Sequence, residues 1–146
     1  MAAQRILCLQ THGRWLGFPL RELRCLRDWE EPHPLPGGVE WLAGWIPYEG
    51  HVVPLVDPAA FVEDGRPPEG GFRMVLMLCF GGVLIGIPGE RAYVTEGREE
   101  TFPEAQSGPW SGMLRADEDR EVRIVDFSLL YTVLSVRYNE NGRNRG

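Results

Sequence analysis

Three histidines and three cysteines are the residues of this chain whose chemistry could supply metal ligands or a nucleophile. In chain order they are Cys8, His12, Cys25, His33, His51 and Cys79. Each histidine stands in or beside a predicted turn and no two share a helix face, so we interpret them as surface histidines rather than as a zinc site. The odd number of cysteines, without a C-x-x-C spacing, indicates neither a disulfide framework nor structural zinc. One nucleophilic arrangement stays open, in which Cys25 would act with His51 as its base.

The other motifs that could indicate an enzyme are incomplete. Residues 108–112 miss the G-x-S-x-G nucleophile elbow by one position and do not stand between a strand and a helix. Residues 117–119 are acidic, but they lack the glycine and the distal glutamate of an EF-hand. All 15 basic residues are arginine, which excludes a P-loop lysine and a Schiff-base lysine. We therefore expect no catalytic residue, no metal and no cofactor.

The overall charge argues against nucleic acids and membranes as partners. The formal net charge is −6 and the sequence pI is about 5.1, so the chain has no basic footprint for DNA, RNA or an anionic lipid surface. The longest apolar stretch, residues 74–87, is interrupted by Gly81-Gly82 and is too short to span a bilayer. The N-terminus shows no secretion signal. We expect a cytoplasmic protein without membrane insertion.

Charge and tryptophan placement indicate where a protein partner could bind. Residues 1–27 carry five arginines and one acid, whereas residues 28–69 carry nine acids and one arginine. Such a bias is usual for a solvated face, and it also suits a partner selected by charge. Trp29 and Trp45 lie beside or within the acidic segment, and we regard them as candidates for an exposed hot spot.

Frequent turns and few helices are expected from 18 glycines and 12 prolines, a composition that favours an all-β fold. Three predicted hairpins each consist of two apolar runs with turn residues between them. They are residues 6–9 with 15–18, residues 44–48 with 51–57 around Glu49-Gly50, and residues 74–80 with 83–88 around Gly81-Gly82. Weaker strands are predicted at residues 92–95, 113–114 and 122–125.

Prolines and one capping residue limit these elements. Pro47 and Pro54 lack an amide donor, so their strands are expected at sheet edges or bulges. Residues 20–26 fit either a helical turn or a strand, and the pattern does not decide between them. Asp126 can cap a closing helix whose apolar residues follow helical spacing. These residues are Phe127, Leu130, Tyr131 and Leu134. Short strands followed by one helix indicate one or two small barrels.

Several short motifs follow one another in an order typical of one family. Leu35-Pro36 precedes Gly44, and these are followed by Gly50 and by Pro54-Leu55-Val56-Asp57. Supporting motifs are Phe18-Pro19-Leu20, Gly86-Ile87 and the segment 122–127 that leads to Leu130. With these motifs the chain resembles the CheW-like domains of bacterial chemosensory systems over residues 5–135.

The resemblance implies a fold of two small SH3-like five-stranded β-barrels packed together, with a short C-terminal helix. We expect a single domain over residues 1–136, with a break between the two barrels near residues 62–72. The polar tail, residues 137–146, has nothing to bury and is expected to be disordered.

The resemblance also implies a non-enzymatic adaptor that couples the cytoplasmic tip of a chemoreceptor to the regulatory domain of a CheA-type histidine kinase. The residues expected at its partner surface are Leu23, Arg24, Cys25, Leu26, Trp45, Tyr48, Glu49 and His51. The family usually has arginine at the position of Glu49 and often glutamate at that of Cys25, so we expect an altered partner preference. The alternatives are a small enzyme that uses Cys25 and His51, and a barrel that holds a small ligand.

Overall fold

The fold is that of an all-β protein. The structure, a computed structural model, describes residues 4–35, 42–60, 62, 69–98, 110–116, 120–126 and 129–130. Within these ranges the strands are β1 (Gln4–Thr11), β2 (Arg14–Pro19), β3 (Leu23–Asp28), β4 (Leu42–Tyr48), β5 (His51–Val56), β6 (Met74–Phe80), β7 (Val83–Gly89), β8 (Arg91–Gly97), β9 (Trp110–Ala116) and β10 (Arg120–Val125). Two short 3-10 turns, η1 (Leu20–Glu22) and η2 (Pro58–Ala60), follow β2 and β5. No helix in the described part of the chain has the length and apolar character needed to cross a membrane.

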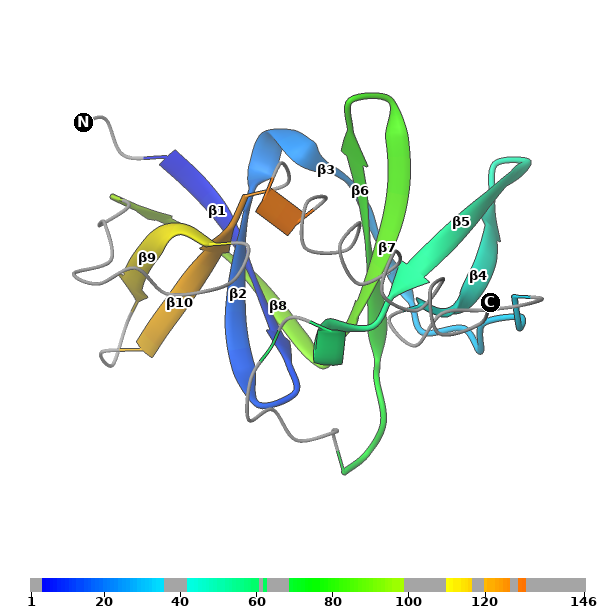
Figure 1. The fold of residues 1–146 in the computed structure, drawn as a ribbon. Helices are drawn as coiled ribbons and strands as arrows, with labels where there is room; N and C mark the ends of the chain where they lie inside the picture. The colour runs from blue at the N-terminus through cyan, green and yellow to red at the C-terminus, as the bar shows by residue number, and fades with distance from the viewer. Residues whose placement is uncertain are drawn as a thin grey trace, which may run out of the picture.

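The first five-stranded sheet closes into a small barrel, at the left of Figure 1. Its strand order is β8-β1-β2-β10-β9, and every pair is antiparallel except β10 with β2. The outer strands meet where Gly97 of β8 lies against Leu114 of β9, which leaves no room for a side chain on the glycine. Alternate residues of each strand point inward. The barrel interior is filled by Ile6, Cys8, Leu114, Val122 and Ile124.

The second five-stranded sheet forms the second barrel, at the right of Figure 1. Its order is β3-β6-β7-β5-β4. Parallel pairing joins β5 to β7 only at Leu55 and Gly86, and Leu55 occupies the space that a side chain at position 86 would need. The interior is filled by Ile46, Val53, Leu55, Val75 and Met77.

A third hydrophobic cluster contains residues from both barrels. The first barrel supplies Leu7, Leu9, Leu16 and Phe18, and the second supplies Leu76, Leu78 and Ile87, all at most 1% exposed. Because side chains alternate along a strand, the residues next to these in β1 and β6 point into the barrel interiors. Both faces of β1 and β6 are therefore buried, which explains why their sequences are continuous apolar runs. Truncating one such side chain costs about 2–5 kcal/mol. Burial of the side chains in this cluster is therefore the main contribution to the stability of the contact between the barrels.

The three predicted hairpins are confirmed. They are the antiparallel pairs β1–β2, β4–β5 and β6–β7. Gly50, Gly81 and Gly82 have positive φ angles, as tight turns between strands require. Residues 20–26 contain both predicted alternatives, because the 3-10 turn η1 is followed directly by β3. The weak strand predicted at residues 92–95 extends over all of β8.

Two expectations about sheet organisation differ from the structure. The segment near residues 62–72, where a break between the barrels was expected, joins β5 to β6 within the second sheet. The chain instead passes between the sheets at η1 and again between β7 and β8. Pro47 lies in the edge strand β4 as predicted, but Pro54 lies in the internal strand β5. β5 pairs with β7 only at Leu55, the residue after Pro54. The strand can therefore accommodate a proline, which has no amide donor.

Asp126 has the geometry of a helix-capping residue. The Leu129 amide donates to Asp126 Oδ1 at 3.1 Å, and the Leu130 amide donates to the main-chain oxygen of Asp126 at 2.8 Å. A side-chain oxygen that accepts from the third residue of a turn is typical of an N-cap. The remainder of the expected helix and the tail at residues 137–146 lie outside the described residues.

Candidate functional site

The candidate surface consists of β3 and the β4–β5 hairpin, residues 23–28 and 45–53, where the second barrel closes. The strands β3 and β4 lie at opposite ends of the sheet order, and side chains connect them. Arg27 Nη1 donates to the carbonyl oxygen of Pro47 at 2.8 Å, and its guanidinium carbon lies 5.7 Å from the centroid of the Tyr48 ring. Glu30 Oε2 lies 3.5 Å from Arg27 Nη2. Arg27 therefore fixes the hairpin against β3.

A second contact across the same closure joins Cys25 of β3 to Tyr48 at the end of β4. The Tyr48 hydroxyl donates to the sulfur of Cys25, and this bond is the largest cause of a raised pKa for Tyr48. Desolvation and the electrostatic influence of Cys25 and Glu49 add to the increase, and Arg24 opposes it. Tyr48 therefore stays protonated and acts as a hydrogen-bond donor.

Arg24 occupies a β-bulge between Leu23 and Cys25, where the register of β3 against β6 shifts. A bulge turns one side chain out of the regular alternation, and the exposed guanidinium of Arg24 donates to the sulfur of Cys79 on β6. This bond and the electrostatic influence of Cys79 raise the pKa of Arg24, desolvation opposes the increase, and Tyr48 and Glu49 add smaller contributions to it. Arg24 is therefore a permanent positive charge at the centre of the surface.

Glu49 projects from the tip of the β4–β5 hairpin. Its φ is +47° and that of Gly50 is +81°, the two positive φ angles of a type I′ turn. Glutamate rarely adopts this conformation, which costs about 1–2 kcal/mol for a residue with a Cβ atom. The tight turn holds the exposed carboxylate in a defined direction, on the hairpin that Arg27 fixes.

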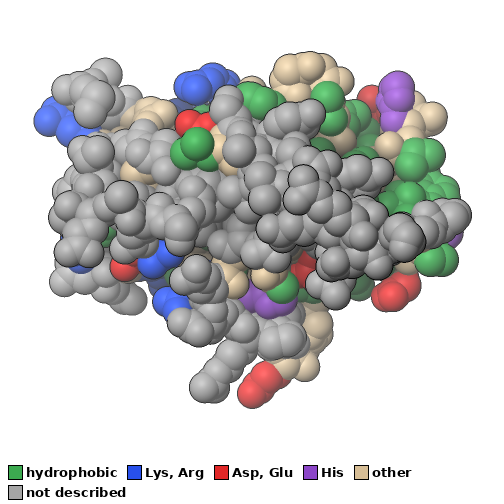
Figure 2. All heavy atoms as spheres, viewed as in Figure 1, with side chains coloured by type: hydrophobic (Ala, Val, Ile, Leu, Met, Phe, Trp, Pro, Cys, Tyr) green, Lys and Arg blue, Asp and Glu red, His purple; other side chains and the backbone are tan. Residues whose placement is uncertain are grey.

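Two exposed hydrophobic side chains lie on the same strands as these polar groups. Leu26 on β3 is 44% exposed and Val52 on β5 is 64% exposed. Figure 2 shows hydrophobic side chains gathered at the right of the molecule, over the β4–β5 hairpin. Exposed apolar groups beside charged ones are typical of a protein-binding surface.

The structure brings most of the predicted surface residues together but gives two of them other contacts. Leu23 packs against the hydrophobic cluster between the barrels. The half-buried ring of Trp45 lies over His33, with centroids 4.5 Å apart, and the two residues exchange backbone hydrogen bonds. His51 is exposed and pairs with Tyr48 across the hairpin.

Trp29 is half-buried against Phe72, at 5.3 Å between ring centroids. It packs on the core of the second barrel rather than forming an exposed hot spot.

Two residues were missed from the sequence, Arg27 within the candidate surface and Cys79 beside it on β6. Arg27 follows Cys25 at the two-residue period of a strand, so the alternation pattern could have identified it. Cys79 could not be found in this way, because only the pairing of β3 with β6 brings it to Arg24.

The described residues do not assemble the enzymatic alternative. Within the described residues the polar partner of Cys25 is the hydroxyl of Tyr48, which is not the histidine base that a thiol nucleophile uses. Within the described ranges no three His, Cys, Asp or Glu side chains are grouped to hold a metal ion. Hydrophobic clusters of described residues occupy both barrel interiors, so their side chains take the space that a small ligand would need.

The protein consists of two packed SH3-like barrels, and polar and apolar residues share one surface where the second barrel closes. These features are typical of an all-β binding module. The sequence matches the CheW-like domain family over residues 5–134, and the chain belongs to that family. Its fold is similar to the crystal structure of the scaffolding protein TtCheW from Thermoanaerobacter tengcongensis. That match has a TM-score of 0.73 and 16% sequence identity, and it covers 86% of each chain. No curated protein matches the chain.

Proposed function

We propose that this protein is a non-enzymatic adaptor of a bacterial chemosensory system, which couples chemoreceptor tips to the regulatory domain of a CheA-type histidine kinase. Membership of the CheW-like family supports this proposal, as does a fold shared with a protein described as a scaffold.

The observation that carries the proposal is the convergence of Arg24, Cys25, Tyr48 and Glu49 at the closure of the second barrel. They come from two separate segments of the chain and lie beside the exposed Leu26. A rigid turn and the Arg27 contact hold them in place before any partner binds. Such preorganisation reduces the entropy cost of binding.

The surface also suits a partner different from that of an ordinary family member. Glu49 stands where the family usually has arginine, and Cys25 stands where it often has glutamate. The two positions near Tyr48 therefore differ together from the usual family pattern. An arginine at the hairpin tip beside a carboxylate is replaced by the carboxylate of Glu49 beside the thiol of Cys25. We infer that the kinase domain of the same organism presents a basic patch to Glu49, because like charges across an interface are strongly unfavourable.

The test is a binding titration of wild type, Glu49→Arg and Glu96→Arg against that kinase regulatory domain at low and high salt. Glu96 is exposed on β8 of the first barrel, so its variant carries the same charge change away from the candidate surface. We expect Glu49→Arg to weaken binding by more than about 1 kcal/mol at low salt, and less at high salt. A change below about 0.5 kcal/mol, the size of an ordinary surface substitution, or an equal effect of Glu96→Arg, would show that this hairpin is not the binding site.

A further inference from the structure

The chain crosses from the second barrel to the first at Glu90, the residue between β7 and β8. The Glu90 amide donates to the carbonyl oxygen of Gln10 on β1 at 2.8 Å. The Arg73 amide, just before β6, donates to the carbonyl oxygen of Gly89 at 2.9 Å. Strands of both barrels therefore fix the backbone on the two sides of Glu90.

A cavity of ≈ 240 Å³ lies beside this crossing. Its lining combines two arginines, two glutamates and two glycines, which are Arg73, Arg91, Glu69, Glu90, Gly70 and Gly71. A Cβ atom added at either glycine would meet nothing within 4 Å, so this side of the cavity is open. The volume is below the roughly 300–1,000 Å³ of sites for drug-sized ligands and well above the share of about 30 Å³ that one water occupies. The cavity therefore suits a molecule of a few heavy atoms.

The Glu90 carboxylate brings an unsatisfied oxygen to this cavity. Its Oε1 atom is buried from solvent and has no hydrogen-bond partner among the described residues. Thr11 and Glu90 each lie one position beyond the Gln10–Arg91 pair of β1 and β8, yet the buried hydroxyl of Thr11 does not donate to Glu90 and is itself unpaired there. Buried acceptors without a donor are costly and rare in native structures. A cationic N–H group on a bound molecule would supply the missing donor.

The two arginines of the lining provide the opposite charge. Arg73 and Arg91 are exposed, and within the described ranges no ion pair joins either of them to a glutamate of the cavity. Guanidinium groups present paired donors that match the two oxygens of a carboxylate. The cavity thus offers an acceptor for a cation and donors for an anion. Because its four charges balance, it favours a ligand with one charge of each sign.

We propose that this cavity binds a small zwitterion of the α-amino acid type, with the ammonium group on Glu90 Oε1 and the carboxylate on Arg73 and Arg91. A simple carboxylic acid would leave Glu90 Oε1 unpaired, and a simple amine would leave both guanidinium groups without an anion. The cavity lies outside the candidate surface at residues 23–28 and 45–53, so the proposal does not depend on the adaptor function.

The first test is a calorimetric titration of the full chain with four matched probes. Alanine carries both charges, propionate lacks the ammonium group, and ethylamine lacks the carboxylate. N,N,N-trimethylalanine keeps both charges but has no N–H donor. We expect saturable binding of alanine and an affinity at least about tenfold lower for each of the other three, the effect of losing a hydrogen bond to a charged group. Absence of saturable alanine binding at millimolar concentrations, or equal affinity for N,N,N-trimethylalanine, would overturn the proposal.

The second test locates the binding with charge-removing variants. Glu90→Gln and Arg73→Gln should each weaken alanine binding about tenfold or more. Glu96→Gln on β8 and Arg115→Gln on β9 remove the same charges at exposed positions outside the cavity and should leave the affinity unchanged. In the wild type, alanine should shift the amide resonances of Gly70, Gly71 and Glu90. Equal effects of the control variants, or resonance shifts confined to other residues, would show that alanine does not bind in this cavity.

Discussion

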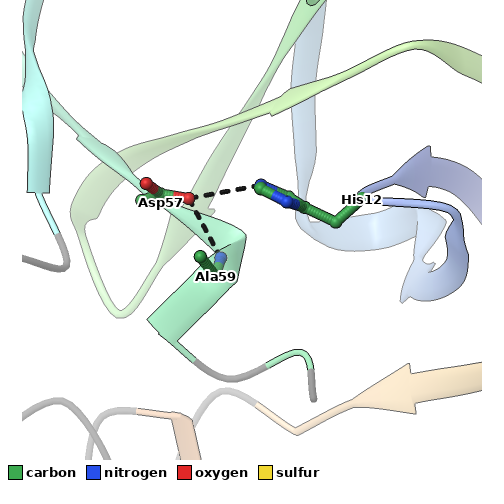
Figure 3. A network of polar contacts seen from close by, with 3 residues as sticks. All are labelled: His12, Asp57 and Ala59. Carbon is green, nitrogen blue, oxygen red and sulfur yellow. Dashed lines mark hydrogen bonds and ion pairs between the residues drawn. The ribbon is translucent and has the colours of Figure 1, made fainter. Parts of the chain in front are cut away.

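His12 Nε2 lies 3.3 Å from Asp57 Oδ1, and this pair joins the two barrels (Figure 3). His12 is in the turn between β1 and β2 of the first barrel, and Asp57 follows β5 of the second. The expectation of a surface histidine is wrong at this position, because His12 is only 6% exposed. Its ring also meets Phe72 edge-on, with centroids 5.8 Å apart. The same oxygen of Asp57 accepts from the Ala59 amide at 2.9 Å.

Removing the Asp57 carboxylate should loosen this junction. Asp57→Ala leaves the buried His12 without its partner and removes the acceptor for Ala59, so we expect a loss of about 1–3 kcal/mol in the free energy of unfolding. Chemical denaturation measures this loss. Glu121→Ala is the control, because the ion pair of Glu121 with Arg123 at 3.3 Å is solvent-exposed and such pairs contribute about 0–1 kcal/mol. Equal losses in the two variants would contradict a junction role for Asp57.

Glu22 should make the fold less stable as the pH rises. Burial raises its pKa, the nearby Asp126 raises it further, and Arg21 partly opposes this. A raised folded-state pKa means that the protonated form supports the fold. This contribution is complete below the unfolded-state pKa and is lost as the pH rises through the folded-state pKa. Glu22→Gln should therefore melt at a higher temperature than wild type at about pH 7 and at a similar temperature at about pH 4.

Thermal melts of Glu22→Gln and of Glu96→Gln, at an exposed position of β8, separate this effect from a general change in net charge. A stabilisation by Glu22→Gln that has the same size at both pH values would show that ionisation of Glu22 is not its cause.

Arg27 should control the mobility of the β4–β5 hairpin. Arg27→Gln removes the charged donor to Pro47 and the cation beside Tyr48, and we expect a loss of about 1 kcal/mol in stability. The local effect should be faster amide exchange in the hairpin, measured by hydrogen–deuterium exchange, with unchanged exchange in β1. Arg91→Gln, at an exposed position of β8, is the control. Uniform acceleration across both barrels would mean that Arg27 supports the whole fold rather than the hairpin.

Gly44 should tolerate alanine less well than the turn glycine Gly82. Both have positive φ angles, +138° and +82°, so both variants suffer backbone strain. A Cβ atom at position 44 would also collide with the carbonyl oxygen of His33, whereas one at position 82 meets nothing within 4 Å. We expect Gly44→Ala to lose about 1–3 kcal/mol more than Gly82→Ala. Similar losses in denaturant titrations would show that the strand segment near His33 can move aside.

The hairpins could be predicted from the sequence because their determinants are local. Glu49-Gly50 and Gly81-Gly82 provide the positive φ angles of their turns, and the apolar runs beside them provide the strands. The same locality explains the Asp126 cap, which depends on residues within four positions along the chain. The order of motifs over residues 5–135 was sufficient to indicate the family.

Only the tertiary structure decided which strands belong to which barrel, because pairing between distant strands depends on packing rather than on turn residues. The parallel pair β10–β2, the burial of His12 beside Asp57 and the contact of Arg24 with Cys79 all arise from such pairing. Local patterns specify the face on which a side chain lies, but not the strand that will lie opposite it. The sequence by itself therefore determined the hairpins and the family, and the sheet order determined how the candidate surface is assembled.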